Sequence, residues 1–177
     1  MKKFAFINLV ILILAFSVFG QKTKVDPAKD VRAAFDRLVE GIKQNDADKV
    51  MSVYDNNART LFFNYNGSAT LGWETMLNNR KLSYAKTTDT NLEITGLRVE
   101  ILSPTAAYVS CKWKQTQEYE GKLESSTGRM TLVFKKIGKE WKIVHLHTSP
   151  DVAPKDINIP PSEKDLKDSP IKPLLPR

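Results

Sequence analysis

Apolar residues recur with two different periods, which divide the chain into a helical part and a strand part. From residue 31 to residue 42 they follow the i, i+3, i+4, i+7 spacing of one helical stripe. The stripe consists of Val31, Ala34, Phe35, Leu38, Val39 and Ile42. Asp26 followed by Pro27 is typical of an N-cap and a first helical residue. The pattern predicts a helix that begins at Pro27 and ends by Asn45.

Two shorter helices are predicted next. Asp46 or Asp48 can cap the first of them, and its apolar stripe is Val50, Val53 and Tyr54. Between these two helices, residues 59–65 are rich in aromatic and apolar side chains, which predicts a strand, and they end at Asn66-Gly67, a dipeptide typical of turns. Residues 70–82 place Trp73, Met76 and Leu77 on one helical face, which predicts the last helix.

The second half alternates with period two and predicts four strands, over residues 91–102, 105–118, 125–137 and 140–148. Their connections are hairpin-sized, so the strands should pair antiparallel. In the first strand Leu92 and Ile94 have one parity, whereas Leu97 and Val99 have the other, and Gly96 lies at the join. A β-bulge at Gly96 would restore one apolar face and bend the sheet.

The last strand contains both histidines of the protein in the segment WKIVHLHTS, residues 141–149. Side chains on a strand alternate between its faces, so His145 and His147 should share a face with Trp141 and Ile143. This combination is unlike a solvated surface. The segment therefore predicts a cavity wall that carries two imidazoles.

The two ends of the chain differ in composition from the part between them. Residues 1–20 combine a basic start, an apolar run and a cleavable end, which is typical of a secretory signal peptide. The run of about 16 residues is short of the ~20 that span a bilayer. Residues 21–27 form a polar leader, residues 28–150 one domain, and residues 151–177 a Pro-rich tail that we expect to be disordered. The protein should be periplasmic or secreted, of bacterial type, with membrane contact only before cleavage.

Charge and cysteine content exclude several classes of protein. Removal of Lys2 and Lys3 lowers the formal charge from +7 to +5, and the remaining lysines are scattered, so nucleic-acid binding is not expected. Cys111 is the only cysteine, which excludes an internal disulfide and a cysteine-based metal site. It follows Ala107 and Val109 in alternation, so it should be buried as a small apolar residue.

Three segments resemble the SnoaL-like branch of the nuclear transport factor 2-like superfamily, and the resemblance covers residues 28–150. They are QNDAD with VYDNNA (44–48 and 53–58), GRMTLVFKK (128–136) and GKEWKIVHLHTS (138–149). The third segment is also similar to the end of the association domain of calcium/calmodulin-dependent protein kinase II. The resemblance implies a cone-shaped α+β fold, with three N-terminal helices packed on a curved antiparallel sheet. It does not imply one function, because this superfamily includes enzymes, ligand binders and assembly modules.

The resemblance extends to ketosteroid isomerase, but the groups that perform its reaction are missing. That enzyme needs an Asp base, with a Tyr and a protonated Asp as oxyanion donors. Alignment without gaps inside each motif places these three groups on Phe62, Leu38 and Met130, which are all apolar. Without a base at Phe62 nothing removes the α-proton. Isomerase activity of that type is therefore not expected.

Five residues are candidates for a ligand site: Trp73, Tyr108, Arg129, His145 and His147. The histidines can contact a ligand, exchange protons, or only hydrogen-bond locally beside Trp141. They lack further ligands for a metal ion, and no cofactor or metal is expected. Arg129 can bind a carboxylate or phosphate if it faces the cavity, or lie at the surface. Trp73 can close the mouth of the cavity or belong to the core.

These patterns favour an exported, non-catalytic domain that binds a small, anionic ligand in a cone cavity. The alternatives are a dehydratase, isomerase or hydrolase that uses His145 and His147, and an assembly module that dimerises through the outer sheet face. A homodimer is expected in either case.

Overall fold

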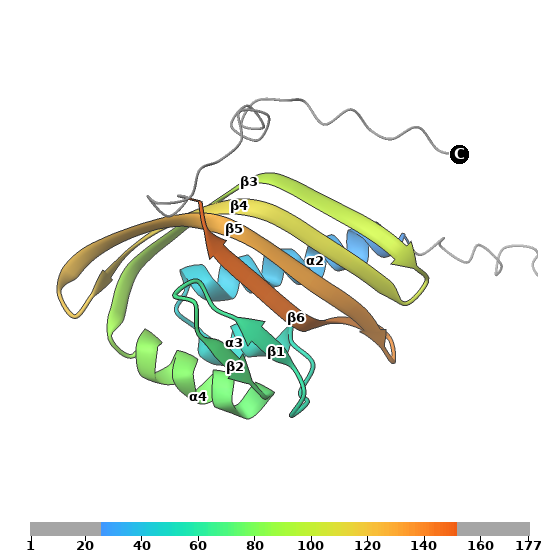
Figure 1. Cartoon of the computed structure of the whole chain (residues 1–177), viewed down its shortest axis with the longest axis horizontal. Helices are drawn as coiled ribbons and strands as arrows, with labels where there is room; N and C mark the ends of the chain where they lie inside the picture. The colour runs from blue at the N-terminus through green and yellow to red at the C-terminus, as the bar shows by residue number, and fades with distance from the viewer. Residues whose placement is uncertain (1–25, 152–177) are drawn as a thin grey trace, which may run out of the picture.

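The structure, a computed structural model, describes residues 26–151 (Figure 1). The predicted signal peptide, most of the leader and the tail beyond Asp151 lie outside the described residues. Within the described part, no helix is long and apolar enough to cross a membrane.

Three helices form where the apolar stripes predict them. Helix α2 (Pro27–Lys43) begins at the Asp26 cap, whose side chain accepts a hydrogen bond from the Ala28 amide at 3.1 Å. Helix α3 (Ala47–Ser52) is capped by Asp46, which accepts from the Lys49 amide at 2.8 Å. Helix α4 (Trp73–Tyr84) begins three residues later than the predicted segment 70–82, because residues 69–71 form a short strand instead.

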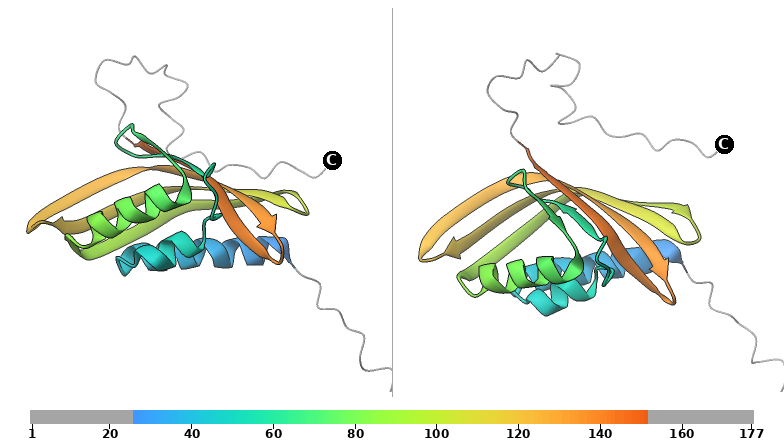
Figure 2. Two further views of the ribbon diagram at one scale, coloured as in Figure 1. Left: turned by 90° about the horizontal axis from the view of Figure 1, so that it is seen from below. Right: turned by 60° about the horizontal axis from the view of Figure 1, so that its bottom comes forward.

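The sheet has six strands: β1 (Leu61–Phe63), β2 (Ala69–Leu71), β3 (Thr87–Ser103), β4 (Ala106–Tyr119), β5 (Lys122–Ile137) and β6 (Glu140–Pro150). Their order is β2-β1-β6-β5-β4-β3. The antiparallel pairing predicted for the four long strands is confirmed. The sheet as a whole is mixed, because β1 lies parallel to β6. Figure 2 shows that the sheet curves over the three helices, which all lie against its concave face.

The predicted bulge at Gly96 is confirmed. The pairing of β3 with β4 shifts register between Thr95 and Arg98, and Gly96 adopts a φ of 61°, a conformation that glycine accepts without strain. Beyond the shift, Val99 and Ile101 pair with Val109 and Ala107, the buried residues of β4. The bulge therefore lets one long strand keep a continuous apolar face while it bends.

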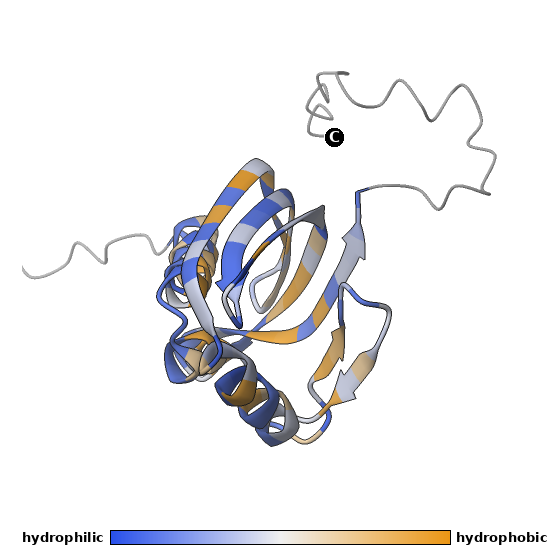
Figure 3. Ribbon diagram, turned by 90° about the vertical axis from the view of Figure 1, so that its left-hand side faces the viewer, coloured by the Kyte–Doolittle hydropathy of each residue, from blue (hydrophilic) through white to orange (hydrophobic). Residues whose placement is uncertain are grey.

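The core fills the space between α2 and the concave face of the sheet. Its largest fully buried side chains are Phe35, Leu38, Met51, Phe62, Val109, Leu132, Phe134 and Ile143. Polar and apolar residues alternate along the long strands, as the hydropathy colours of Figure 3 show. Cys111 is buried in this core, as its alternation predicted, and burial raises the pKa of its thiol to about 11. The core fills only part of the concavity, and a cavity remains beside α4.

Candidate functional site

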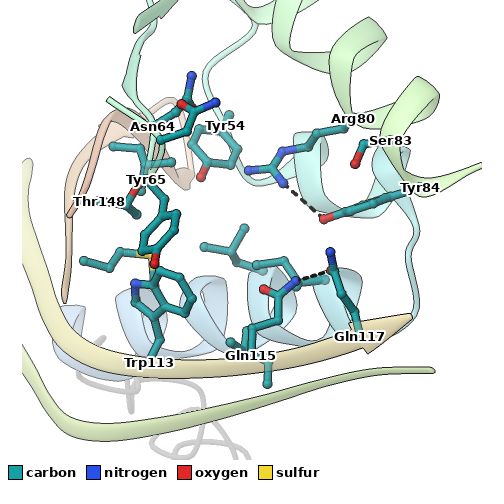
Figure 4. A pocket seen from close by; sticks show the side chains of 16 residues that line it. Tyr54, Asn64, Tyr65, Arg80, Ser83, Tyr84, Trp113, Gln115, Gln117 and Thr148 are labelled. Atoms are coloured by element: carbon teal, nitrogen blue, oxygen red, sulfur yellow. Dashed lines mark hydrogen bonds between the residues drawn. The ribbon is translucent and has the colours of Figure 1, made fainter. Parts of the chain in front are cut away.

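A cavity of about 450 Å³ lies between α4, the turn after β1 and the concave face of the sheet (Figure 4). This volume is within the range of small-molecule sites. Its polar wall consists of Tyr54, Asn64, Tyr65, Asn66, Arg80, Ser83, Tyr84, Gln115, Gln117 and Thr148. Its apolar wall consists of Leu38, Ile42, Leu92, Trp113, Met130 and Leu146.

Arg80 is the one cationic residue in this cavity wall within the described chain. Helix α4 positions Arg80 one turn before Tyr84, so that both side chains leave the same face of the helix. The Nη1 atom of Arg80 donates to the Tyr84 hydroxyl at 3.1 Å, and the guanidinium carbon lies 6.0 Å from the Tyr84 ring centre. The Nε atom is buried and has no hydrogen-bond partner among residues 26–151. The guanidinium thus keeps a free donor.

Tyr54 enters the cavity from the segment that follows α3. This segment lies parallel to β6: the Ile143 amide donates to the Val53 carbonyl and the Asp55 amide donates to the Ile143 carbonyl, both at 2.9 Å. The Tyr54 ring packs against Phe62 with ring centres 5.0 Å apart, and the residue is only 2% exposed. Burial raises the pKa of Tyr54 to about 12 despite the opposing effect of Arg80. Tyr54 therefore presents a neutral hydroxyl at neutral pH.

The charge of the cavity is uncompensated. Its described lining contains no Asp, Glu, His or Lys. Burial on its own lowers the pKa of Arg80, but the Tyr84 and Tyr54 oxygens beside it raise the pKa above its usual value. The guanidinium therefore remains charged. Nowhere in residues 26–151 do three or more His, Cys, Asp or Glu side chains gather in a way that could hold a metal ion.

The histidines do not lie where the sequence pattern suggested, because β6 contains a bulge. The pairing of β5 with β6 shifts register between Val133, opposite His145, and Phe134, opposite Ile143, which leaves Val144 as the extra residue. Trp141 and Ile143 therefore face the core, whereas Leu146 and Thr148 face the cavity. The prediction that His145 and His147 share a face with Trp141 is wrong.

Both histidines lie on the outer face of the sheet beside Phe63. The His145 Nδ1 atom donates to the Leu61 carbonyl at 3.0 Å, since a carbonyl oxygen can only accept. The Phe63 ring meets His145 and His147 edge to face, with ring centres 5.4 and 5.7 Å apart. This arrangement matches the alternative in which the histidines only hydrogen-bond locally, except that they lie beside Phe63 and not beside Trp141.

The other three predicted site residues also lie outside the cavity lining. Arg129 is at the outer surface with 60% of its side chain exposed, and its Nε atom lies 3.6 Å from the Asp151 carboxylate. Tyr108 is half-buried on the outer face between Glu100 and Val133. Trp73 packs against the core and donates from Nε1 to the Met51 carbonyl at 2.8 Å. The structure therefore does not bring the five residues together, and a ligand contact by them stays a prediction.

The positions aligned with the isomerase groups fall in or beside the cavity. Leu38 and Met130 line it, while Phe62 is fully buried next to Tyr54. All three positions are apolar in this chain. The polar groups of the cavity come from other positions.

The cavity residues that the sequence interpretation missed had weak signals. Arg80 and Tyr84 have the i, i+4 spacing of one helix face, but the helix is amphipathic only in part and Arg80 resembles a solvated residue. Tyr65 precedes a turn and gives no periodic signal. Trp113 follows Cys111 in the same alternation, so its inward position could have been inferred from the sequence, and it lines the cavity.

Comparison with known proteins agrees with this fold. Residues 31–153 match the SnoaL-like domain, and the chain belongs to that family. No curated protein matches the sequence.

Three solved structures illustrate the likeness. An NTF-2 like protein of unknown function from Shewanella oneidensis is 25% identical, with a TM-score of 0.56, over 70% of this chain and 99% of its own. An NTF2-like superfamily protein from Salmonella enterica is 22% identical, with a TM-score of 0.65, over 71% of this chain and 92% of its own. A Xanthomonas campestris protein named for the calcium/calmodulin-dependent protein kinase II association domain is 20% identical, with a TM-score of 0.60, over 72% of this chain and 90% of its own. At these identities the likeness concerns the fold.

Proposed function

We propose that this protein binds a small organic monoanion in the cone cavity, with Arg80 as the anchor of the anionic group. The observation that carries the proposal is a charged, half-buried guanidinium that faces the cavity without a carboxylate in the described lining. A buried charge is unfavourable unless it is paired, so a ligand anion supplies the missing partner.

The groups around Arg80 favour a carboxylate. One guanidinium offers one positive charge, and its planar donors match the two oxygens of a carboxylate. Tyr84 and Tyr54 add neutral hydroxyl donors nearby. A dianion such as a phosphate monoester would leave an excess negative charge in a cavity that has no second cation in its described lining.

The same cavity gives little support to proton-transfer catalysis. General acids and bases work best when their pKa lies near the working pH. The cavity offers tyrosines, amides and hydroxyls, and the Tyr54 pKa of about 12 is far from neutrality. These groups suit binding more than turnover, which is why we favour a binding protein over a dehydratase, isomerase or hydrolase.

The test is calorimetric titration of the full chain with benzoate, cinnamate and 2-naphthoate and with the neutral carboxamide of each. We expect at least one carboxylate to bind about tenfold or more tightly than its amide, since charged hydrogen bonds contribute about 1.5–3 kcal/mol. Arg80→Met should abolish this difference, whereas Arg129→Met should leave it intact. If Arg129→Met abolished the difference and Arg80→Met left it intact, the proposal would be contradicted and the anion would bind at Arg129.

A second candidate function is self-association through the outer sheet face. Phe63 is 41% exposed on this face and forms an aromatic cluster with His145 and His147. Sedimentation velocity should show a dimer for the full chain and a monomer for Phe63→Glu. A wild-type monomer at micromolar concentration would contradict it.

Export is proposed from the N-terminal pattern alone, and the N-terminus of the protein recovered from its host tests it.

A further inference from the structure

The wall of the cavity opposite Arg80 contains Trp113 (Figure 4), whose indole lies against Gly128 of the neighbouring strand. Gly128 of β5 stands directly opposite Trp113 of β4. A Cβ atom at Gly128 would lie 2.7 and 2.8 Å from the Cζ2 and Cε2 atoms of the indole, closer than real contacts allow. Glycine at this position is therefore what permits the indole to lie against the sheet and form part of the cavity wall.

The indole N–H of Trp113 lacks an acceptor. Its Nε1 atom is buried and has no hydrogen-bond partner within residues 26–151, as is also true of Arg80 Nε. Both groups can only donate. A buried donor without an acceptor is costly, so each favours an acceptor on a bound molecule. The two donors belong to opposite walls, one on α4 and one on the sheet.

Tyr65 packs edge to face against Trp113. The two rings meet at 69° with centres 5.2 Å apart, and Tyr65 is 39% exposed. Tyr65 belongs to the turn between β1 and β2, which are only three residues long each. A ligand ring that displaces the Tyr65 ring keeps an aromatic contact with Trp113 and gains access to its N–H.

Part of the cavity wall is apolar and includes Leu38, Leu92, Met130 and Leu146, together with the Trp113 ring. Gln115 and Gln117 of the sheet also line the cavity. The apolar part suits a flat, apolar ligand core with polar groups at its ends. A flexible polar ligand, such as an amino acid or a sugar acid, would leave polar groups unpaired against these side chains.

We propose that the ligand is an aromatic carboxylate with an oxygen acceptor at the end remote from the carboxylate. The carboxylate pairs with Arg80, and the remote oxygen accepts from Trp113 Nε1. The inference rests on the proposed function, and it adds the chemical class of the ligand and the residue that selects it.

The experiment compares pairs of ligands that differ only in the remote acceptor. The full chain is titrated with the 4-acetyl and 4-isopropyl forms of benzoate and cinnamate and with the 6-acetyl and 6-isopropyl forms of 2-naphthoate. Acetyl and isopropyl have the same number of heavy atoms and a similar size, but only acetyl accepts a hydrogen bond. For the core whose length fits, we expect the acetyl form to bind about fivefold more tightly, the value of one net hydrogen bond.

Trp113→Phe keeps a ring and removes the donor, so it should abolish this preference and leave Arg80-dependent binding of the isopropyl form. Trp141→Phe is the matched control, because Trp141 Nε1 is also buried without a described partner but lies in the core. The wild-type protein supplies a second measurement that needs no variant. The indole N–H proton resonance of Trp113 should move downfield with the acetyl form only, while that of Trp141 stays in place.

Two results overturn the inference and can be told apart. Equal affinity of acetyl and isopropyl forms for every core, or a preference that survives Trp113→Phe, rejects the ligand class while Arg80-dependent binding stands. Absence of binding by every carboxylate rejects the proposed function together with the inference.

Discussion

Replacement of Arg80 by Met should separate stability from binding. In the free protein Arg80 is a charge with one neutral hydrogen-bond partner, Tyr84, and a buried Nε donor that has none within residues 26–151. Under the proposed function, such a group serves a ligand at the expense of the stability of the fold. Methionine has a similar length and helix propensity and carries no charge, so it tests that balance directly.

The expected change in the free energy of unfolding follows from three contributions. Loss of the hydrogen bond to Tyr84 costs about 1.5–3 kcal/mol, as for bonds that involve a charged group. Removal of the unpaired Nε–H returns about 1–3 kcal/mol of desolvation cost. Removal of the charge itself returns a smaller desolvation cost than that of a fully buried ion, because the Arg80 side chain is only half-buried. We therefore expect Arg80→Met to be as stable as the wild type, or more stable by up to about 2 kcal/mol.

The assay is urea unfolding of the ligand-free full chain, with Lys81→Met as the matched control. Lys81 is the next residue of the same helix, and its exposed pair with Asp48 at 2.9 Å should contribute at most about 1 kcal/mol. If Arg80→Met loses more than about 1 kcal/mol relative to Lys81→Met, Arg80 holds α4 in place and its role is structural.

Three further changes test the packing of the fold and the site. Gly128→Ala would put a Cβ atom 2.4 Å from the Ser149 carbonyl oxygen and against Trp113, so chemical denaturation should show a loss of about 1–3 kcal/mol. Phe62→Ala removes a ring with 0% exposure and should lose about 3–5 kcal/mol in the same assay. The fold favours the protonated hydroxyl of Tyr54, whose pKa is about 12 in the folded chain against the ordinary tyrosine value of 10.0. The stability that this preference contributes is fully present below pH 10 and is lost as the pH rises from 10 to 12. Tyr54→Phe should remove about 2–3 kcal/mol of that alkaline loss.

The results that would contradict these expectations differ. Wild-type stability of Gly128→Ala would mean that Trp113 does not lie on β5. A loss below about 1 kcal/mol for Phe62→Ala would contradict its place in the core. An identical pH dependence for Tyr54→Phe and the wild type would mean that the Tyr54 hydroxyl is hydrated.

The fold could be predicted from the sequence because its main elements have local signals. The stripe of α2, the Asp26 and Asp46 caps and the alternation of β3 to β6 all survive in the structure. The bulge at Gly96 was also predictable, since a glycine marked the change of parity. Strand β2 was not, because residues 69–71 are too short for a periodic signal and continue into a helix.

The bulge at Val144 explains why the histidines do not share a face with Trp141, as the sequence pattern predicted. In β6 the buried residues are Trp141, Ile143 and Leu146, so the apolar spacing changes from two to three. The same signal identified the Gly96 bulge, but here no glycine marks it and two histidines suggested an uninterrupted face. One extra residue moves every later side chain to the other face. His145 and His147 thereby lie outside, and Leu146 and Thr148 line the cavity.

The arginine of the site could not be chosen from sequence. Arg129 lies in a strand that the family resemblance favoured, whereas Arg80 lies on a helix with many polar residues. The packing of α4 over the cavity makes Arg80 face inward, whereas Arg129 faces outward because it alternates with the buried Met130 on β5. An arginine was expected in the cavity wall, and the structure places Arg80 there instead of Arg129.

The most direct test of the central claim follows the Nε–H resonances of the arginines by NMR while an aryl carboxylate such as 2-naphthoate is added. The Arg80 signal should shift and saturate with the dissociation constant found by calorimetry, while the Arg129 signal stays in place. A saturating shift of Arg129, or of the His145 and His147 ring signals, with Arg80 unchanged, would contradict the assignment of the anion site to the cone cavity.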